Sequence, residues 1–295
     1  MKLQLSVLTL IAAGLIATTT ANAAEDTKAY YGSVRVGVTK SSGASTDFAN
    51  WNSRLGIKGE TEVRPGLTGF GKYELGINIG NKDATKDLTT RHAYLGLKGK
   101  MGELLVGKTD TTYYNLGVAP VDIANWWSCN GCVGNIDRKT SVMYTKSLGK
   151  LSVGAAHTMR DGNDDKAKGN ELGVSYKVGN TTLGLAAQKP HGEKEAISAV
   201  VGGSTGKVTY AAYIGKDKAS DEKGVDLHLG YGNYYFTVGQ KDTADAKPLG
   251  YTLGYGRDLG KNFSTWVEAN RKETKPDVGS NAKTTSYGVA LRYDF

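Results

Sequence analysis

Apolar and polar residues alternate along much of this chain with a period of two. The pattern is clearest in residues 67–80, where one parity holds Leu67, Gly69, Gly71, Tyr73, Leu75, Ile77 and Ile79 and the other holds Thr68, Lys72, Glu74 and Asn78. It recurs at 172–178, 225–231 and 286–295. Because successive side chains of a β-strand point to opposite faces, this period predicts strands with one apolar and one polar face.

We predict a strand wherever such a run is bounded by turn residues. Sixteen segments meet this condition: residues 29–39, 48–62, 67–80, 87–99, 102–109, 138–147, 150–160, 168–178, 181–189, 194–203, 206–216, 222–232, 234–241, 247–258, 262–273 and 283–295. Tight turns such as Arg64-Pro65-Gly66 alternate with longer polar loops such as residues 216–223. This alternation is typical of an up-and-down barrel in the bacterial outer membrane.

A soluble β-sandwich is the alternative fold, since half-buried strands in water also alternate. The solvent face of a sandwich would be rich in Lys, Glu and Thr, whereas the polar parity here holds repeated Gly, Ala and Ser with isolated charges. Sixteen regular strands also exceed the usual size of a sandwich domain. We therefore predict an all-β fold, a 16-stranded antiparallel transmembrane β-barrel over residues 24–295.

Residues 1–23 have the pattern of a secretory signal peptide. Lys2 precedes an apolar run at 5–17, and the small-residue ending Ala21-Asn22-Ala23 follows. We predict cleavage before Ala24 and Sec export through the periplasm. No later apolar stretch reaches the length of a transmembrane helix, which excludes a helical membrane protein.

Composition agrees with a sheet protein and gives no sign of catalysis. Glycine is frequent (40 residues), proline is rare (5), and tyrosine (17) outnumbers phenylalanine (5), as many turns, small inward-facing positions and interfacial tyrosines would require. The net charge of +8 is dispersed, without the dense basic run expected for nucleic-acid binding. The four histidines lack metal-site spacing, and no catalytic arrangement can be singled out, so we predict no metal, no cofactor and no enzymatic activity.

Residues 109–137 form the longest interruption of the strand pattern. An irregular connection of this length is usually either functional or disordered. Its apolar content disfavours disorder, because the following side chains are costly to leave in water: Tyr113, Tyr114, Leu116, Val118, Val121, Ile123, Trp126, Trp127, Val133 and Ile136. We predict that this loop folds into the barrel against its wall and narrows the pore.

Four sequence runs carry a family resemblance: Ser53–Glu60 (SRLGIKGE), Leu67–Glu74 (LTGFGKYE), Arg91–Lys98 (RHAYLGLK) and Gly102–Lys108 (GELLVGK). In order and spacing they resemble the general diffusion porins of Gram-negative bacteria. The resemblance implies an outer-membrane location, sixteen strands, a homotrimer and a third loop folded inward against wall arginines. The C-terminal run Tyr287–Phe295 is similar to the last strand of outer-membrane barrels, which implies that it closes the barrel and that the barrel assembly machinery reads Phe295.

The resemblance also implies which arginines line the pore. Arg54 and Arg91 match the first two wall arginines of the family, and strand parity independently turns Arg54 away from its apolar neighbours. Arg138 is the candidate for the third, but the spacing after it is one residue shorter than in the family, so its facing stays open. The family often has a lysine at the position of Ser33, and Arg35, two residues on and on the same face, is the expected substitute.

Asp122 is the best match to the loop carboxylates that face these cations in the family. Opposite fixed charges in a narrow aqueous passage orient permeating dipoles, and an excess of one sign biases ion selectivity. With four arginines against one aspartate we predict a weak anion preference. Any single arginine could instead pair with Glu60 or Glu74 and have no effect on selectivity.

The two cysteines of the chain are Cys129 and Cys132, which flank Asn130-Gly131. This spacing in an exported chain predicts a small disulfide that stiffens a loop tip, because the periplasm is oxidising. Redox or zinc chemistry would need a partner motif that the chain lacks.

The predicted function is passive diffusion of ions and small hydrophilic solutes through a water-filled outer-membrane channel. The predicted surroundings are outer-membrane lipid and lipopolysaccharide. Two alternatives stay open. One is a substrate-selective channel, for example for sugars, in which Tyr113, Tyr114, Trp126 and Trp127 form a binding track instead of fixing the loop to the wall. The other is an outer-membrane barrel enzyme or adhesin.

Overall fold

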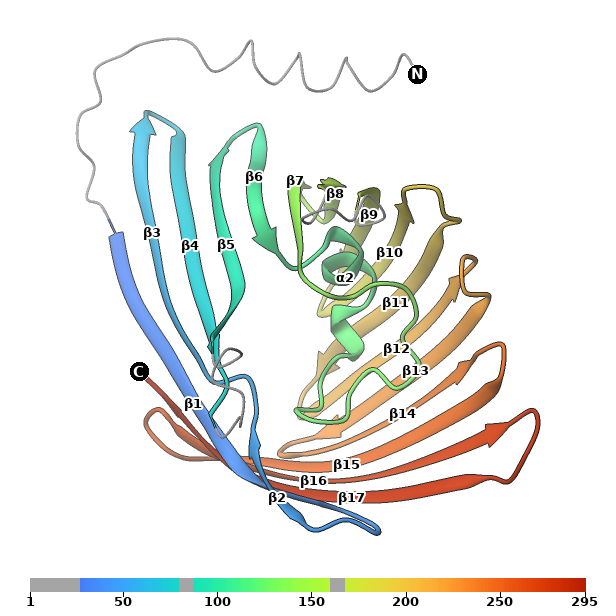
Figure 1. Cartoon of the computed structure of the whole chain (residues 1–295). Helices are drawn as coiled ribbons and strands as arrows, with labels where there is room; N and C mark the ends of the chain where they lie inside the picture. Colours follow the sequence, from blue (N-terminus) through green and yellow to red (C-terminus); the bar gives the residue numbers. More distant parts are fainter. Residues whose placement is uncertain (1–26, 80–87, 160–167) are drawn as a thin grey trace.

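The computed structural model describes residues 27–79, 88–159 and 168–295, which form a closed antiparallel β-barrel (Figure 1). The predicted signal peptide, residues 1–23, lies outside the described residues. Within the described ranges, no helix has the length and apolar character needed to span a membrane.

The described residues contain seventeen strand segments. They are β1 (Thr27–Ser41), β2 (Thr46–Asn50), β3 (Arg54–Arg64), β4 (Leu67–Ile77), β5 (Leu88–Gly99), β6 (Gly102–Thr109), β7 (Lys139–Leu148), β8 (Leu151–Thr158), β9 (Gly169–Val178), β10 (Thr181–Pro190), β11 (Ala196–Thr205), β12 (Val208–Asp217), β13 (Glu222–Tyr231), β14 (Tyr234–Asp242), β15 (Ala246–Gly260), β16 (Phe263–Pro276) and β17 (Ala282–Asp294). Because β2 and β3 both pair with β1 and make one interrupted wall strand, the barrel has the sixteen strands that the alternation predicted.

The interruption between β2 and β3 is a bulge that the sequence pattern did not reveal, since we predicted one strand over 48–62. Val36 pairs with Asn50, whereas Ser33 pairs with Arg54, so one extra residue is inserted opposite β1. Asn52 takes a positive φ of 56°, and the Ser53 hydroxyl accepts a hydrogen bond from the Arg35 backbone N–H at 2.9 Å. The bulge therefore ties this part of the wall to β1 beside Arg35.

The last strand closes the barrel, as the sequence predicted. β17 pairs with β1 from Ser33–Asp294 to Ser41–Ser286. The pairing continues at Phe295, whose carbonyl accepts a hydrogen bond from the Gly32 N–H at 2.8 Å. Closure leaves no unpaired sheet edge in a membrane, where an exposed backbone group would be costly.

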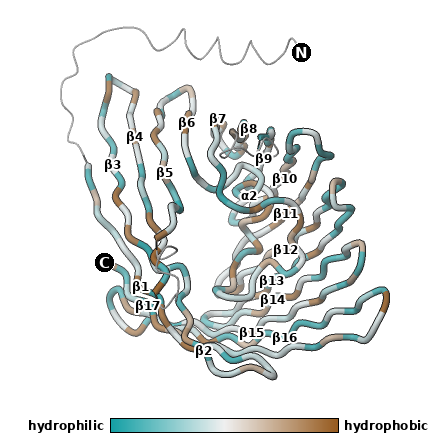
Figure 2. Tube along the Cα trace, viewed as in Figure 1, coloured by the Kyte–Doolittle hydropathy of each residue, from teal (hydrophilic) through white to brown (hydrophobic). Residues whose placement is uncertain are grey.

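The predicted parity separates an apolar outer surface from a polar lumen. Leu95 and Leu172, for example, are 74% and 64% exposed on the outside, whereas inward-facing neighbours such as Glu74 and Glu171 are buried. Hydrophobic and hydrophilic positions are interleaved along the strands (Figure 2). The exposed aliphatic side chains are explained by a lipid surrounding, in which they need no protein partner.

Candidate functional site

The connection between β6 and β7 lies inside the ring of strands (Figure 1). It comprises residues 110–138, here called the long loop, and contains the helix α2 (Thr112–Gly117) and the 3₁₀ turn η2 (Ala119–Val121). Thr111 caps α2 by accepting a hydrogen bond from the Tyr114 N–H at 3.1 Å. The inward fold agrees with the expectation from the loop's apolar content.

Three buried carboxylates on the barrel wall, here called the anchoring carboxylates, accept backbone N–H groups from the long loop. They are Glu171 on β9 with Tyr113 N (3.0 Å), Asp226 on β13 with Gly131 N (2.5 Å), and Glu268 on β16 with Asn125 N (2.5 Å) and Trp126 N (2.9 Å). Hydrogen bonds to charged groups are worth about 1.5–3 kcal/mol each. The loop is therefore fixed to the wall at points along its whole length.

Glycines on the lumen face let the loop lie directly on the wall. A Cβ added at Gly224 would come within 1.7 Å of the Gly131 carbonyl oxygen, and one at Gly184 within 2.0 Å of the Leu116 carbonyl oxygen. At Gly288 it would meet the Trp126 ring at 2.4 Å. We attributed the high glycine content to turns and small inward-facing positions. The structure shows that some of these inward-facing glycines form the surface on which the loop packs.

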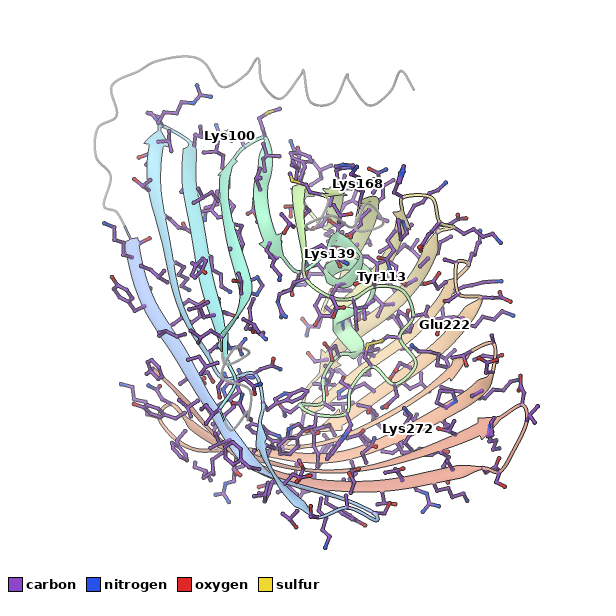
Figure 3. The ribbon with its side chains drawn as sticks, in the orientation of Figure 1. Lys100, Tyr113, Lys139, Lys168, Glu222 and Lys272 are labelled. Atoms are coloured by element: carbon purple, nitrogen blue, oxygen red, sulfur yellow. A yellow bond between two sulfur atoms is a disulfide. The ribbon has the colours of Figure 1, made fainter. Side chains whose placement is uncertain are left out.

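An apolar cluster fills the space between α2 and the wall. Tyr113, Val118 and Val121 are completely buried there, and Figure 3 shows Tyr113 inside the barrel. The Tyr113 hydroxyl donates to the Val133 carbonyl at 3.1 Å. Burial of each large apolar side chain stabilises the packed loop by about 1.5–3 kcal/mol, and it also raises the pKa of Tyr113.

The other aromatic residues of the predicted track have two kinds of partner. Trp126 and Trp127 pack on other aromatic rings, and Tyr114 is hydrogen-bonded to Asp122. Trp126 packs on Trp266 of β16 with ring centroids 5.3 Å apart and on Trp127 at 5.6 Å. The Tyr114 hydroxyl donates to Asp122 at 2.8 Å. Burial and the neighbouring Asp122 charge raise the pKa of Tyr114 well above its usual value.

The wall not covered by the long loop carries positive charge. Here the cationic wall means the inward-facing Arg35 (β1), Arg54 (β3), Lys72 (β4), Arg91 (β5) and Arg292 (β17). The buried Glu74 carboxylate accepts from Arg91 Nε at 2.8 Å and lies 3.2 Å from Lys72 Nζ and 3.9 Å from Arg54. Glu60, by contrast, pairs with Lys98 at 2.6 Å. One carboxylate therefore holds three cations together, and their charge is only partly neutralised.

Arg35 differs from the other cations of this wall. Its Nε donates to the Ser33 hydroxyl at 2.9 Å, which joins the two positions that the family resemblance linked. Arg292 lies directly opposite it on β17 and pairs with Asp294 at 2.7 Å. Among the described residues Arg35 has no carboxylate within ion-pair distance, so no direct ion pair neutralises the charge of this buried side chain.

The side chain of Arg138 points into the lumen, which the sequence left open. Its Nε lies 2.9 Å from Asp110 Oδ1 and donates to His92 Nε2 at 3.3 Å. Strand parity could not predict this direction, because Arg138 precedes β7, which begins at Lys139. Asp110 is a carboxylate at the base of the loop that the sequence analysis did not assign.

Asp122 lies on the side of the long loop that faces away from the wall. It is exposed together with Ile123, whereas Val121 and Ala124 on either side are buried. Its backbone N–H closes the end of η2 by donating to the Ala119 carbonyl, and its carboxylate accepts a hydrogen bond from the Tyr114 hydroxyl. A fixed negative charge therefore projects from the loop into the open lumen.

The predicted disulfide between Cys129 and Cys132 is formed, with Cα atoms 5.0 Å apart. It does not stiffen an exposed loop tip, however, because Cys132 is buried against the wall. The turn that it closes presents Gly131 N–H to Asp226. The bridge thus shapes an anchoring point of the loop.

Sequence reasoning missed the anchoring carboxylates. Parity puts Glu171, Asp226 and Glu268 on the lumen face, but it does not say which lumen positions the loop covers. In the described part of the chain, no group of three or more His, Cys, Asp or Glu residues has the geometry to hold a metal ion.

Comparisons with known proteins agree with this architecture. A family model described as Gram-negative porin matches residues 9–295. Outer membrane protein U of Vibrio vulnificus is 30% identical over 202 residues, which are 65% of this chain and 55% of that protein. Outer membrane porin PhoE of Escherichia coli is 25% identical over 299 residues, covering 98% of this chain and 78% of that one. The first three curated relatives are matched over only 55%, 63% and 62% of their own length.

Two solved structures illustrate the likeness in fold. The trimer form of OmpT from Vibrio cholerae superposes with a TM-score of 0.74 at 16% identity, over 92% of this chain and all of that one (100%). An anion-selective porin from Comamonas acidovorans gives a TM-score of 0.70 at 18% identity, over 92% of this chain and 100% of that one. At these identities the likeness concerns the barrel and not its selectivity.

Proposed function

This chain belongs to the Gram-negative porin family, and from that premise we propose that it forms a water-filled channel through the outer membrane. Ions and small hydrophilic solutes cross it by passive diffusion. The observation that carries the proposal is the division of the lumen, in which a loop fixed by the anchoring carboxylates lies inside a closed barrel and leaves the cationic wall uncovered.

The narrow part of the pore lies, in this proposal, between the exposed face of the long loop and the cationic wall. Arg35, Arg54, Arg91 and Arg138 act on one side and Asp122 on the other. The low-dielectric barrel strengthens the field between opposite charges, which orients polar solutes and disfavours uncharged apolar ones. The ion pairs of Arg54 and Arg91 with Glu74 hold these cations in place without cancelling their combined charge.

The proposed selectivity is a weak preference for anions. Six cations of this region (Arg35, Arg54, Lys72, Arg91, Arg138 and Arg292) stand against four carboxylates (Glu74, Asp110, Asp122 and Asp294). Arg35 contributes most directly, because it lacks a carboxylate partner in the described structure. The excess raises the anion concentration in the passage.

Single-channel recording in planar bilayers under a KCl gradient tests both parts. We expect discrete current steps that vary linearly with voltage, and a reversal potential whose sign shows a preference for anions over cations. A clear cation preference would overturn the selectivity, and an absence of conductance from correctly folded protein would overturn the channel. Titration with maltose or glucose distinguishes a sugar-selective channel, since saturable block would contradict general diffusion.

A homotrimer belongs to the same proposal. The outward faces of β3 and β4 carry Gly59, Gly69 and Gly71, with the Leu95 side chain lying over Gly71, and such small residues let a flat surface of a neighbouring barrel approach closely. OmpT of Vibrio cholerae, of similar fold, is described in a trimer form. Cross-linking of the protein in native outer membranes should stop at three copies, and a product limited to one copy would contradict the trimer.

The channel proposal includes no catalytic activity. Assays of phospholipid and peptide hydrolysis with folded protein should give rates equal to those of empty vesicles. The expected signal-peptide cleavage before Ala24 and the reading of Phe295 by the assembly machinery are separate proposals. N-terminal sequencing of the outer-membrane form tests the first, and the fraction assembled after Phe295→Ser substitution tests the second.

A further inference from the structure

A small cavity, here called the wall pocket, opens on the lumen face of the barrel between β1 and β5. Its volume of about 300 Å³ is at the lower end of the range of about 300–1,000 Å³ for small-molecule sites, which suits a solute with a single ring. Its floor includes the backbone of Gly59 on β3 and Gly71 on β4. Inward-facing side chains of these strands and of β5 form its sides.

The wall pocket lies between the narrow part of the proposed channel and one mouth of the barrel. On β3, Lys58 stands between Arg54 and the tight turn at residues 64–66. Figure 3 labels Lys100 in the β5–β6 turn, at the same end of the barrel. Short turns face the periplasm in an outer-membrane barrel, so a solute that enters from outside meets the wall pocket after it has passed the narrow part.

Two aromatic rings line the wall pocket. Phe70 and Tyr94 pack edge to face, with their ring centroids 6.1 Å apart. They also pack against the buried cluster of Leu105, Met143 and Ala156, which holds the rings in place. Both rings are only partly buried by this packing, so aromatic surface remains open to the lumen. A flat apolar group placed against it would remove that surface from water.

Two lysines of the wall pocket oppose each other. Lys58 and Lys72 are direct cross-strand partners on β3 and β4, and like charges in that position destabilise a sheet. Their Nζ atoms lie 5.9 and 5.5 Å from the centroid of the same Tyr31 ring. Lys72 shares Glu74 with two arginines, whereas Lys58 has no carboxylate within ion-pair distance among the residues that the structure describes.

Glu60 also lines the wall pocket, but its charge is already paired. Its carboxylate lies 2.6 Å from Lys98 Nζ, and the same ammonium group lies over the Phe70 ring, 5.6 Å from its centroid. This pairing leaves the ammonium group of Lys58 to an anion from outside the protein. The wall pocket therefore combines two adjacent cations with open aromatic surface.

We infer that the wall pocket binds small aromatic carboxylates during their passage through the channel. The carboxylate lies between the ammonium groups of Lys58 and Lys72, and the ring lies against Phe70 and Tyr94. Charge-assisted hydrogen bonds relieve the repulsion between the two lysines, and the ring contacts favour an aromatic anion over an aliphatic one. Binding rests on the proposed function for the route by which the solute reaches the wall pocket.

Binding of para-fluorobenzoate to the folded protein in detergent micelles tests the wall pocket. Fluorine NMR line broadening across a titration gives the dissociation constant, with empty micelles as the background. Lys58→Gln should bind about tenfold more weakly, because one charge-assisted contact is lost. The matched control Lys177→Gln removes the same charge from an inward position of β9, beside the tight turn at residues 179–180 and outside the wall pocket, and should bind like the wild type.

Two further solutes separate the ring from the charge. Fluorocyclohexanecarboxylate carries the same charge without an aromatic ring, and para-fluorobenzyl alcohol carries the ring without the charge. Each should bind the wild type roughly fivefold more weakly than para-fluorobenzoate.

A ring variant tests the aromatic side of the wall pocket. Phe70→Leu, which keeps apolar packing on the buried cluster, should lose about threefold in affinity for para-fluorobenzoate. Phe236→Leu, at an exposed position on the outer face of β14, should lose none. Equal affinities of Lys58→Gln and Lys177→Gln, or of para-fluorobenzoate and its cyclohexane analogue, would overturn the inference.

Conductance of the same preparations in KCl separates this inference from the channel proposal. Phe70→Leu and Phe236→Leu should form channels like the wild type, because neither change alters a charge or the long loop. Conducting protein without Lys58-dependent binding of para-fluorobenzoate refutes the wall pocket alone. Folded protein that binds para-fluorobenzoate through Lys58 but does not conduct refutes the channel alone.

Discussion

The two sides of the lumen follow the same alternation of side chains but meet different surroundings. Around β1, β3 to β5 and β17 the inward positions carry long charged side chains that the long loop does not cover. From β8 to β16 the inward positions are mostly glycine, alanine and short polar residues with isolated carboxylates, and the long loop covers them. In the proposed channel, one side therefore supplies charge to the passage, and the other holds the loop that narrows it.

Carboxylates show the difference most clearly. Glu74 on the open side is buried among side-chain cations, with Arg91 Nε at 2.8 Å. Glu268 on the covered side is equally buried, but its partners are two backbone N–H groups of the loop and the Tyr235 hydroxyl. The same residue type positions cations in one region and a backbone segment in the other, so burial alone does not reveal its role.

Removal of an anchoring carboxylate should have the largest effect on the difference between the two sides of the lumen, because it frees the long loop from the side that it covers. Glu268→Ala leaves the N–H groups of Asn125 and Trp126 without their partner, at a cost of about 1–3 kcal/mol for each buried unsatisfied group. We expect the loop to leave the wall, which raises single-channel conductance and adds large current fluctuations. Glu273→Ala, at an outward-facing position on the same strand that pairs with Arg271, is the control. Identical traces for Glu268→Ala and wild type would show that the loop is held by other means.

A side chain introduced beneath the loop should act more moderately. Gly184→Val places a Cβ within 2.0 Å of the Leu116 carbonyl oxygen, whereas a Cβ at Gly256 meets no atom closer than 4.0 Å. Overpacking typically costs about 1–3 kcal/mol. Heat-induced unfolding, followed by the gel mobility of the folded barrel, should therefore begin at a lower temperature for Gly184→Val only. Equal stability of the two variants would contradict direct packing of the loop on the wall.

Neutralisation of the cationic wall should change selectivity and leave the fold intact. Arg35→Gln removes a charge that has no carboxylate partner, and Arg54→Gln removes one of three cations around Glu74. Each should shift the reversal potential toward cations, and the double variant should shift it further. Arg271→Gln, which removes a charge from an outward position of β16 paired with Glu273, should cause no shift. An unchanged potential in the double variant would exclude these arginines from the selectivity of the pore.

Reduction of the disulfide should have the smallest effect. Closing so short a loop contributes roughly 2 kcal/mol in the chain-entropy description, and the loop keeps its bonds to Glu171 and Glu268 without it. The double variant Cys129→Ser/Cys132→Ser should keep the wild-type conductance, with slightly more current noise from the segment near Gly131. A loss of conductance comparable to that of folding mutants would mean that the bridge holds the whole loop.

The sequence predicts the barrel well because period, turn spacing and parity are local properties. All sixteen wall strands, the closing strand and the inward loop could be recognised in this way, and parity alone assigned Arg54 to the lumen. The bulge at residues 51–53 could not be, because it depends on the register between β1 and two other segments. The direction of the Arg138 side chain could not be predicted either. Arg138 precedes its strand, and its ion pair with Asp110 holds the side chain in place.

The roles of the buried carboxylates lie beyond local patterns. Asp226 alternates with Val225 and Leu227 like any lumen residue, and only the path of a loop some 95 positions earlier gives it Gly131 as a partner. The opposition of Lys216 and Lys223 is hidden for the same reason. These residues are separated by a loop in sequence and become cross-strand partners only through the β12–β13 register.

Chemical modification at Asp122 during current recording tests the central claim most directly. In the Asp122→Cys variant the native cysteines are joined to each other, so the introduced thiol is the one available to a methanethiosulfonate reagent carrying a sulfonate. If the loop faces the cationic wall across the narrow passage, each modification should lower the single-channel current in a discrete step, while Asp221→Cys at the β12–β13 loop should not respond. Complete modification at position 122, verified by mass spectrometry, with unchanged current would contradict the account.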